Sequence, residues 1–196
     1  MKTAAGEHKE AVVERERALE LVRENVSQEN LVRHMLATEA IMKALAVRLD
    51  ADPERWGLAG LVHDLDVEET TGRPEVHGRE TVSRLRAAGL RDDEVLGAVA
   101  SHNPANGTVI ESDMGRALFA ADPLTGLITA AALIRPEKKL ELVKLKSLKK
   151  RYKEPAFARG ARREDIATVE QLGLGLEKFL QLGLDAMQGV SGDLGL

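Results

Sequence analysis

Apolar residues recur at intervals of three and four along most of this chain, which is the spacing of an amphipathic helix. A first such segment covers residues 12–26 and is rich in Glu and Arg, and a second covers residues 31–49. No stretch alternates between apolar and polar residues for long enough to indicate a β-strand. The pattern therefore predicts an all-α fold.

Local signals mark where several helices begin and end. Asp52 precedes Pro53, and an N-cap acceptor followed by proline at the first helical position predicts the start of an apolar helix over residues 56–65. Asp92 or Asp93 is expected to cap a helix that reaches residue 102. Further helices are predicted over residues 77–89, from 136 to about 152, from about 163, and over 174–187, with a frayed tail at 189–196.

Proline gives a further boundary. Ser112 is expected to cap a helix over residues 113–122, and Pro123 to end it and begin another that runs through residue 134. Together these elements predict a helical domain over residues 1–134 and a C-terminal helical extension, residues 135–196, packed on the same domain.

Composition narrows the class of protein. Hydrophobic residues make up 43% of the chain and aromatic residues only 3%, so the core is built mainly from Leu, Val, Ala and Ile. The chain has no cysteine, which excludes disulfides and thiolate chemistry. Residues 1–10 are polar, unlike a signal peptide, and no segment approaches the roughly 20 apolar residues of a membrane span. A cytoplasmic protein without a membrane partner is expected.

Charge is distributed unevenly along the chain. Residues 135–163, the basic segment, hold 12 Lys and Arg against 3 Glu, which leaves 16 basic and 29 acidic residues elsewhere. A solvated helix face packed on the core is the favoured interpretation. The alternative is an electrostatic funnel for a polyphosphate nucleotide or RNA. Tyr152 and Phe157 are the only nearby aromatic residues, so base stacking is limited and a nucleic-acid partner is not expected.

The histidines are the main candidates for functional residues. Four of the five fall in one series that ends in an aspartate: His34, His63-Asp64, His77, His102 and Asp122. Histidine loses its proton near neutrality and is a natural ligand for transition metals. The His63-Asp64 pair lies between the apolar residues Leu61-Val62 and Leu65, and a buried carboxylate there needs a partner or a cation. The series predicts one polynuclear metal site, from which His8 in the charged N-terminal stretch is left out.

Simpler interpretations exist for each residue. A single histidine on a helix is more often exposed or hydrogen-bonded in the core than a ligand. Asp122 would also serve as the cap of a helix that begins at Pro123.

The series resembles the HD superfamily of metal-dependent phosphohydrolases, in which a histidine, a His-Asp doublet and a distant aspartate lie on separate helices of an all-α domain. The segments that carry the resemblance are LVRHMLATEAIMKALA, WGLAGLVHDLD, EVHGRETVSRL, EVLGAVASHNP and ALFAADPLTG. They span roughly residues 31–133 and are most similar to small prokaryotic predicted HD hydrolases. They also resemble HD hydrolases that split diadenosine tetraphosphate.

The resemblance implies an HD-domain helical bundle with additional C-terminal helices and a set of ligands. His34, His63, Asp64 and Asp122 would hold a first metal, and Asp64 would bridge to a second held by His77 and His102. One or two divalent ions of Fe, Mn, Co, Ni or Zn suit nitrogen and oxygen ligands without sulfur. Two such ions bind phosphate and lower the pKa of water, so no side-chain nucleophile is needed.

The chain also departs from the family pattern. Leu65-Asp66-Val67 follows the doublet, where many binuclear relatives have Ile-Gly and a lysine, so a lysine phosphate clamp is missing. The interval from Asp64 to His77 is short, which supports the first metal better than the second. Asp66 and Glu68 are candidates for a general acid or for carboxylates that orient the ligands, with solvated loop acids as the alternative.

Three arginines near the series are candidate phosphate ligands by proximity alone: Arg33, Arg79 and Arg116. Ordinary exposed helix residues are the alternative interpretation for each of them.

The expected function is hydrolysis of a phosphate ester or phosphoanhydride in a small phosphorylated substrate, with a nucleotide favoured. Two alternatives stay open, namely a non-catalytic metal-stabilised binding module and a di-iron oxygenase. The chain has neither a glycine-rich phosphate loop nor a dinucleotide-binding fingerprint, so a kinase, P-loop NTPase or nicotinamide enzyme is not expected. A homodimer is compatible with the sequence.

Overall fold

The computed structural model describes residues 14–196, and within them the chain is helical with no β-strand. The predicted all-α fold is thus confirmed, whereas His8 and residues 12 and 13 lie outside the described part. The α-helices are α1 (Arg15–Asn25), α2 (Glu29–Arg48), α3 (Pro53–Val62), α4 (Arg79–Ala87), α5 (Asp93–Ser101), α6 (Asp113–Leu133), α7 (Leu145–Tyr152), α8 (Arg163–Ala167), α9 (Leu176–Gly189) and α10 (Ser191–Leu194). Short 3₁₀ turns cover Pro104–Asn106, Leu140–Leu142 and Thr168–Leu172.

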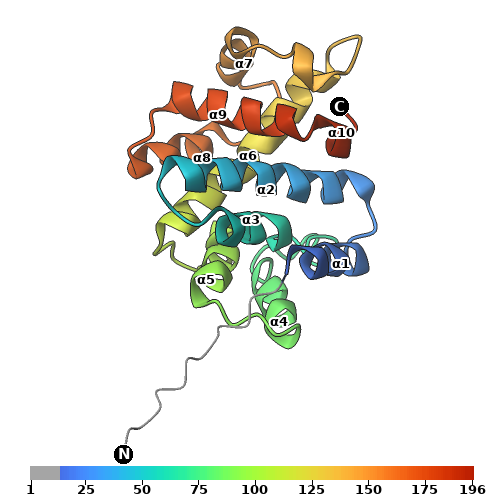
Figure 1. Cartoon of the computed structure of the whole chain (residues 1–196), viewed down its shortest axis with the longest axis vertical. Coiled ribbons are helices and arrows are strands. Elements are labelled where there is room, and N and C mark those ends of the chain that lie inside the picture. The colour runs from blue at the N-terminus through green and yellow to red at the C-terminus, as the bar shows by residue number, and fades with distance from the viewer. Residues whose placement is uncertain (1–13) are drawn as a thin grey trace, which may run out of the picture.

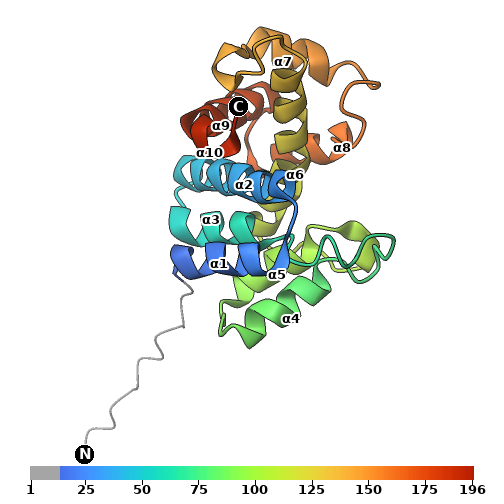
Figure 2. The same cartoon turned by 90° about the vertical axis from the view of Figure 1, so that its right-hand side faces the viewer.

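Helices α2 and α6 form the centre of the molecule. Helix α2 packs on α3 on one side and on α9 and α10 on the other, and α6 contacts α5, α7, α8 and α9 (Figures 1 and 2). The C-terminal helices α7–α10 therefore cover one side of α2, and α1, α3, α4 and α5 lie on the opposite side. Residues of the metal series come from both central helices, from the ends of α3 and α5, and from the loop before α4.

Three predicted helix starts are confirmed by their hydrogen bonds. Asp52 accepts from the backbone N–H groups of residues 54 and 55, at 2.9 and 3.3 Å. Asp92 does the same for residues 94 and 95, both at 3.1 Å. Ser112 accepts from Gly115 at 3.0 Å. Each cap satisfies N–H groups that the first turn leaves without a partner.

Other boundaries differ from the sequence-based prediction. Pro123 lies inside one continuous helix, α6, rather than at the start of a second one, because packing of α6 against its neighbours outweighs the missing hydrogen bond. Helix α3 ends at Val62, not at residue 65. The expected frayed tail instead forms α10, where Leu194 is buried and Ser191 donates a hydrogen bond to Glu141 at 2.6 Å.

Helix α6 corrects the expectation about membrane-length segments. It has 21 residues and is apolar enough to cross a membrane by length and composition alone. However, 56% of its apolar window is buried inside the protein, and it contacts helices on both sides of the molecule. Its apolar character is that of a core helix.

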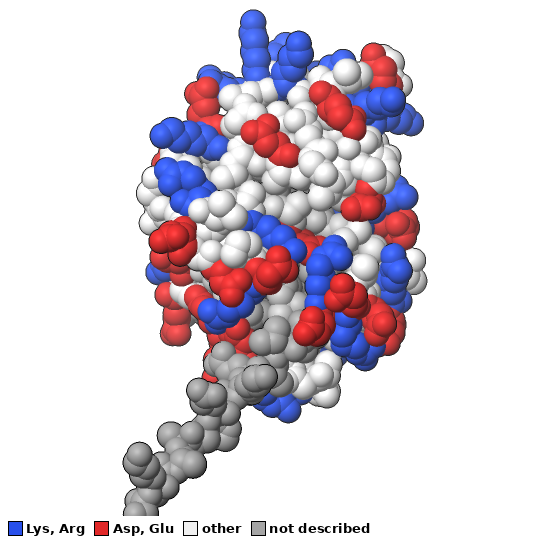
Figure 3. Space-filling model, viewed as in Figure 1, with Lys and Arg blue, Asp and Glu red and all other residues white. Residues whose placement is uncertain are grey.

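The basic segment packs on the core through its apolar residues. Leu140, Val143 and Leu148 are buried, and Lys149 forms an ion pair with Glu177 at 2.6 Å. Several Lys and Arg side chains crowd the surface at the end of the molecule where α7 lies (Figure 3). This arrangement fits the interpretation of the segment as a solvated helix face.

A close approach of α2 and α3 sets the position of the site. A Cβ added at Gly60 would lie 2.9 Å from the carbonyl of Thr38 and 2.9 Å from the backbone nitrogen of Glu39. Only glycine allows the two helices to pack this closely, and this packing brings the end of α3 against α2.

Replacing Gly60 with alanine should therefore lower the free energy of unfolding by about 1–3 kcal/mol, because the helices must separate. Equilibrium urea unfolding measures the change. Gly97 in α5 is the matched control: it is exposed, and an added Cβ would meet nothing within 4 Å. Alanine there should stabilise the protein by about 0.4–1 kcal/mol. Equal effects at both positions would contradict the role of Gly60.

Candidate metal centre

His63 and His102 occupy equivalent positions, each as the C-cap residue of its helix, α3 or α5. His63 Nδ1 donates to the carbonyl of Gly60 at 2.9 Å, and His102 Nδ1 donates to that of Val99 at 2.6 Å. A carbonyl oxygen only accepts, so Nδ1 carries the proton in both rings. In the neutral imidazole each Nε2 then presents a lone pair to the interior, which is the tautomer that binds metal.

His34 on α2 is fixed through a residue of α6. The Thr125 hydroxyl donates its single proton to the carbonyl of Asp122 at 2.7 Å, and it accepts from His34 Nδ1 at 2.8 Å. His34 Nε2 then lies 3.1 Å from Asp122 Oδ1. The two central helices thus bring an imidazole and a carboxylate together with the imidazole in a defined tautomer.

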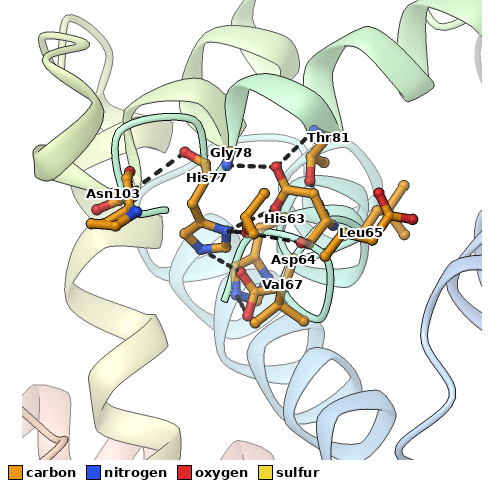
Figure 4. Close-up of polar contacts among 12 residues, drawn as sticks. His63, Asp64, Leu65, Val67, His77, Gly78, Thr81 and Asn103 are labelled. Carbon is orange, nitrogen blue, oxygen red and sulfur yellow. Dashed lines mark hydrogen bonds and ion pairs between the residues drawn. The ribbon is translucent and has the colours of Figure 1, made fainter. Parts of the chain in front are cut away.

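His77 stands just before α4 and is held from several directions (Figure 4). Its Nδ1 donates to Asp66 Oδ1 at 2.7 Å, and its carbonyl accepts from Asn106 at 2.8 Å. Gly78 follows with φ of 85°, and a Cβ there would lie 3.2 Å from the His102 ring. Glycine at 78 therefore allows both the turn and the close approach of the two imidazoles.

Asp64 lies between two pairs of histidines. His34 Nε2 and His63 Nε2 are 3.3 Å apart, and Asp64 Oδ2 lies 3.8 and 3.5 Å from them. On the other side, His77 Nε2 and His102 Nε2 are 3.1 Å apart, and Asp64 Oδ1 lies 3.1 and 3.3 Å from them. One carboxylate thus offers one oxygen to each pair.

These distances fit divalent ions. Two ligand atoms that bind one ion at about 2.1 Å each lie roughly 3.0–3.4 Å apart. Asp64 Oδ1 is buried and makes no hydrogen bond, although a buried carboxylate oxygen ordinarily has a partner. Facing lone pairs on two imidazoles also repel unless a cation or a proton lies between them. Groups of ligand atoms within 4.8 Å of one another comprise His34, His63 and Asp122, and His63, Asp64 and His102.

Charges in the centre change the pKa values of its members. Burial lowers the pKa of His77, but the carboxylates of Asp64 and Asp66 outweigh burial and raise it to about 10. Burial raises the pKa of Asp64, yet the surrounding histidines hold it well below its ordinary value. Burial lowers the pKa of His63, which therefore keeps its lone pair. The site is thus built for positive charge near Asp64.

Comparison with known proteins agrees with this geometry. Residues 31–127 match the family model described as the HD domain. The chain belongs to the HD domain family. No curated protein and no solved structure gave a match. Family membership together with the His/Asp cluster indicates a metal-dependent hydrolase. The finer resemblance of this HD protein to hydrolases of diadenosine tetraphosphate stays a prediction.

Asp66 is surrounded by hydrogen-bond donors of the HD centre. Its carboxylate is fully buried and accepts from His77 Nδ1, from the backbone nitrogen of Gly78 at 2.8 Å and from that of Thr81 at 3.0 Å. Three of its roughly four acceptor positions are thus occupied, and its bond to Nδ1 fixes the orientation of the His77 ring, which favours the second of the two roles considered for Asp66.

Glu68 also has a structural contact. Its exposed carboxylate accepts from the backbone nitrogens of Ser27 and Gln28, at 3.1 and 2.8 Å. It therefore stabilises the start of α2, and the general-acid role of Glu68 stays a prediction.

The three predicted phosphate arginines of the HD segment are engaged elsewhere. Arg33 pairs with Glu29 at 3.3 Å, and Arg116 pairs with Asp113 at 2.9 Å. Arg79 donates to the carbonyl of Asn106. None of the three lines the cleft that opens onto the metal ligands, so proximity in sequence was a poor guide to their positions.

That cleft contains residues that the sequence analysis missed. It has a volume of about 200 Å³ and is lined by His77, His102, Asn103, Pro104, Phe119, Asp122, Pro123, Gly160, Arg162 and Asp165. Thr125 could have been found from its position one helical turn after Asp122. Arg162 and Asp165 carry no local signal, because the chain returns to the HD centre only after more than 20 residues beyond α6.

Proposed function

We propose that this protein is a metal-dependent phosphohydrolase that cleaves a small phosphorylated substrate by attack of water. The single observation that supports this function most is the placement of Asp64, whose two oxygens face two separate pairs of histidines. A carboxylate so placed suits a shared ligand of two ions. We infer that His34, His63, Asp64 and Asp122 hold one ion, and that Asp64, His77 and His102 hold the other.

The chemistry follows from this ligand set. Divalent ions held here would neutralise charge on a phosphoryl group and lower the pKa of a water molecule, which supplies the nucleophile. The chain's own residues keep the ligands in place: Thr125 and Asp66 fix the tautomers of His34 and His77. Asn103 and Asn106 hold the loop before α4 through the carbonyl groups of Pro74 and His77, at 2.6 and 2.8 Å. The cleft gives a substrate access to the ligands.

The test begins with the metal content of the full chain, purified without chelator or histidine tag. We expect two transition-metal ions per chain and hydrolysis of p-nitrophenyl phosphate or a nucleotide in the presence of Mn²⁺ or Fe²⁺. A chelator should abolish the hydrolysis, and the metal should restore it.

Three other results would contradict this proposal in distinct ways. Bound metal without turnover of any phosphate ester would favour the binding module. Consumption of dioxygen by the iron-loaded protein would favour an oxygenase. A single ion per chain at saturation would leave a mononuclear site and remove His77 and His102 from the ligand set.

A further inference from the structure

The C-terminal extension contributes one wall of the cleft. Seven of the lining residues belong to the matched HD segment, whereas Gly160, Arg162 and Asp165 come from beyond residue 127. Helix α8 packs against α6, which carries Asp122, and this contact holds the extension beside the metal ligands. The entrance to the centre is therefore formed jointly by the HD core and by a segment outside it.

Arg162 places the hydrogen-bond donors of its guanidinium group on this wall of the cleft. Its Nε forms ion pairs with Asp165 at 3.0 Å and with Glu164 at 3.4 Å. Within residues 14–196 its two terminal nitrogens make no hydrogen bond, and 55% of its side chain is exposed. A guanidinium with both terminal nitrogens available presents the flat pair of donors that binds two phosphate oxygens at once.

Asp165 is placed to hold that guanidinium. Its side chain is 13% exposed, and its Oδ2 is the partner of Arg162 Nε. Burial raises the pKa of Asp165; the positive charge of Arg162 opposes this increase, and the negative charges of Glu164 and Asp122 add to it. Asp122 is therefore near enough for its charge to act on Asp165.

The neighbouring arginine fixes the loop from which Arg162 projects. Arg163 donates to the carbonyl groups of Tyr152 at 3.0 Å, Ala158 at 3.0 Å and Phe157 at 2.6 Å, and also to that of Ala161. The hydroxyl of Tyr152 donates back to the carbonyl of Arg163 at 2.9 Å. A loop tied in this way places the Arg162 backbone before a ligand arrives, which lowers the entropy lost on binding.

We propose that Arg162 is the phosphate-binding residue of this centre, that Asp165 is its positioning residue, and that the preferred substrate is a phosphomonoester. The inference rests on the proposed function. A terminal phosphate carries two negative charges and three unesterified oxygens, so it offers a guanidinium more acceptors than a diester does. The cleft of about 200 Å³ is smaller than the roughly 300–1,000 Å³ of sites that enclose whole drug-sized ligands. It therefore suits the phosphoryl group and the atoms next to it.

Binding of inorganic phosphate to the metal-loaded full chain, measured by calorimetry, tests the assignment without turnover. Arg162→Ala should raise the Kd for phosphate by about 10–100-fold, the equivalent of one charged hydrogen-bonded contact. Metal content and melting temperature should stay unchanged. Asp165→Asn should raise the Kd less than Arg162→Ala does, because the guanidinium remains but is held less firmly. Arg116→Ala is the matched control, since Arg116 pairs with Asp113 outside the cleft and should leave the Kd unchanged.

Kinetics add a second readout on the same variants. Arg162→Ala should raise KM for p-nitrophenyl phosphate more than it lowers kcat, and it should reduce the preference for this monoester over bis(p-nitrophenyl) phosphate.

Each outcome bears on one assignment. Equal Kd values for the Arg162 and Arg116 variants, or no phosphate binding by the loaded wild-type protein, would overturn the inference. Phosphate binding that depends on Arg162, without hydrolysis of any ester, would support the inference and contradict the proposed function. Hydrolysis by the wild-type protein, with KM and Kd unchanged in Arg162→Ala, would support the proposed function and overturn the inference.

Discussion

Replacing Asp64 with alanine should remove metal from both parts of the centre and abolish activity together with it. Asp64 gives one oxygen to the His34–His63 pair and the other to the His77–His102 pair, so one substitution removes a ligand from each. Because water activated by metal carries the proposed reaction, and enzymes accelerate reactions by about 10⁶-fold or more, a loss of several orders of magnitude is expected. Elemental analysis and hydrolysis assays on the same preparation measure the two losses.

Asp113→Asn provides the control for this variant. Asp113 is the first residue of α6, it is exposed, and within residues 14–196 its ion pair is with Arg116 at 2.9 Å. Its replacement should change neither metal content nor activity. If Asp64→Ala kept one ion at wild-type affinity, the assignment of Asp64 as a shared ligand would be wrong.

Replacing Asp66 with alanine should cost stability and weaken one half of the centre. The substitution leaves the buried N–H groups of Gly78 and Thr81 without an acceptor, at a cost of about 1–3 kcal/mol for each one left unsatisfied. His77 Nδ1 keeps only the weaker contact with the Thr70 hydroxyl at 3.2 Å. Loss of a hydrogen bond that orients a ligand also lowers metal affinity by about 10–100-fold. Urea unfolding and metal titration should show both effects, with the ion near His77 lost first.

Glu68→Ala separates the two effects. Glu68 caps the backbone at Ser27 and Gln28, so its loss should cost about 0.5–2 kcal/mol of stability, as for other helix caps, without changing metal affinity. Equal metal affinities in the Asp66 and Glu68 variants would contradict the orienting role of Asp66.

The sequence predicted features that depend on neighbouring residues. Asp52, Asp92 and Ser112 begin helices because a side-chain oxygen two or three residues away satisfies the first turn. The helix boundary predicted at Pro123 was wrong, because packing around α6 keeps the helix continuous through this residue. A helix in the centre of a molecule gains enough from its contacts to tolerate one missing hydrogen bond.

The same distinction applies to the site. All six proposed ligands were named from their order along the chain together with the resemblance to the HD superfamily, and the structure brings them together around Asp64. The phosphate arginines could not be chosen in this way, because proximity along a helix does not determine which side of it faces the cleft. Arg162 lines the cleft because the C-terminal extension folds back onto the HD core. The spacing of apolar residues in the sequence does not predict this contact.

The positions of His63 and His102 at helix ends give the centre a second property. The carbonyl three residues before the end of a helix lacks a backbone partner, and in α3 and α5 the imidazole supplies it. The same ring therefore terminates a helix with one nitrogen and faces the ligand cluster with the other. Order at these two helix ends, which are about 40 residues apart in the chain, is consequently linked to the occupancy of the two proposed ion positions, which share Asp64.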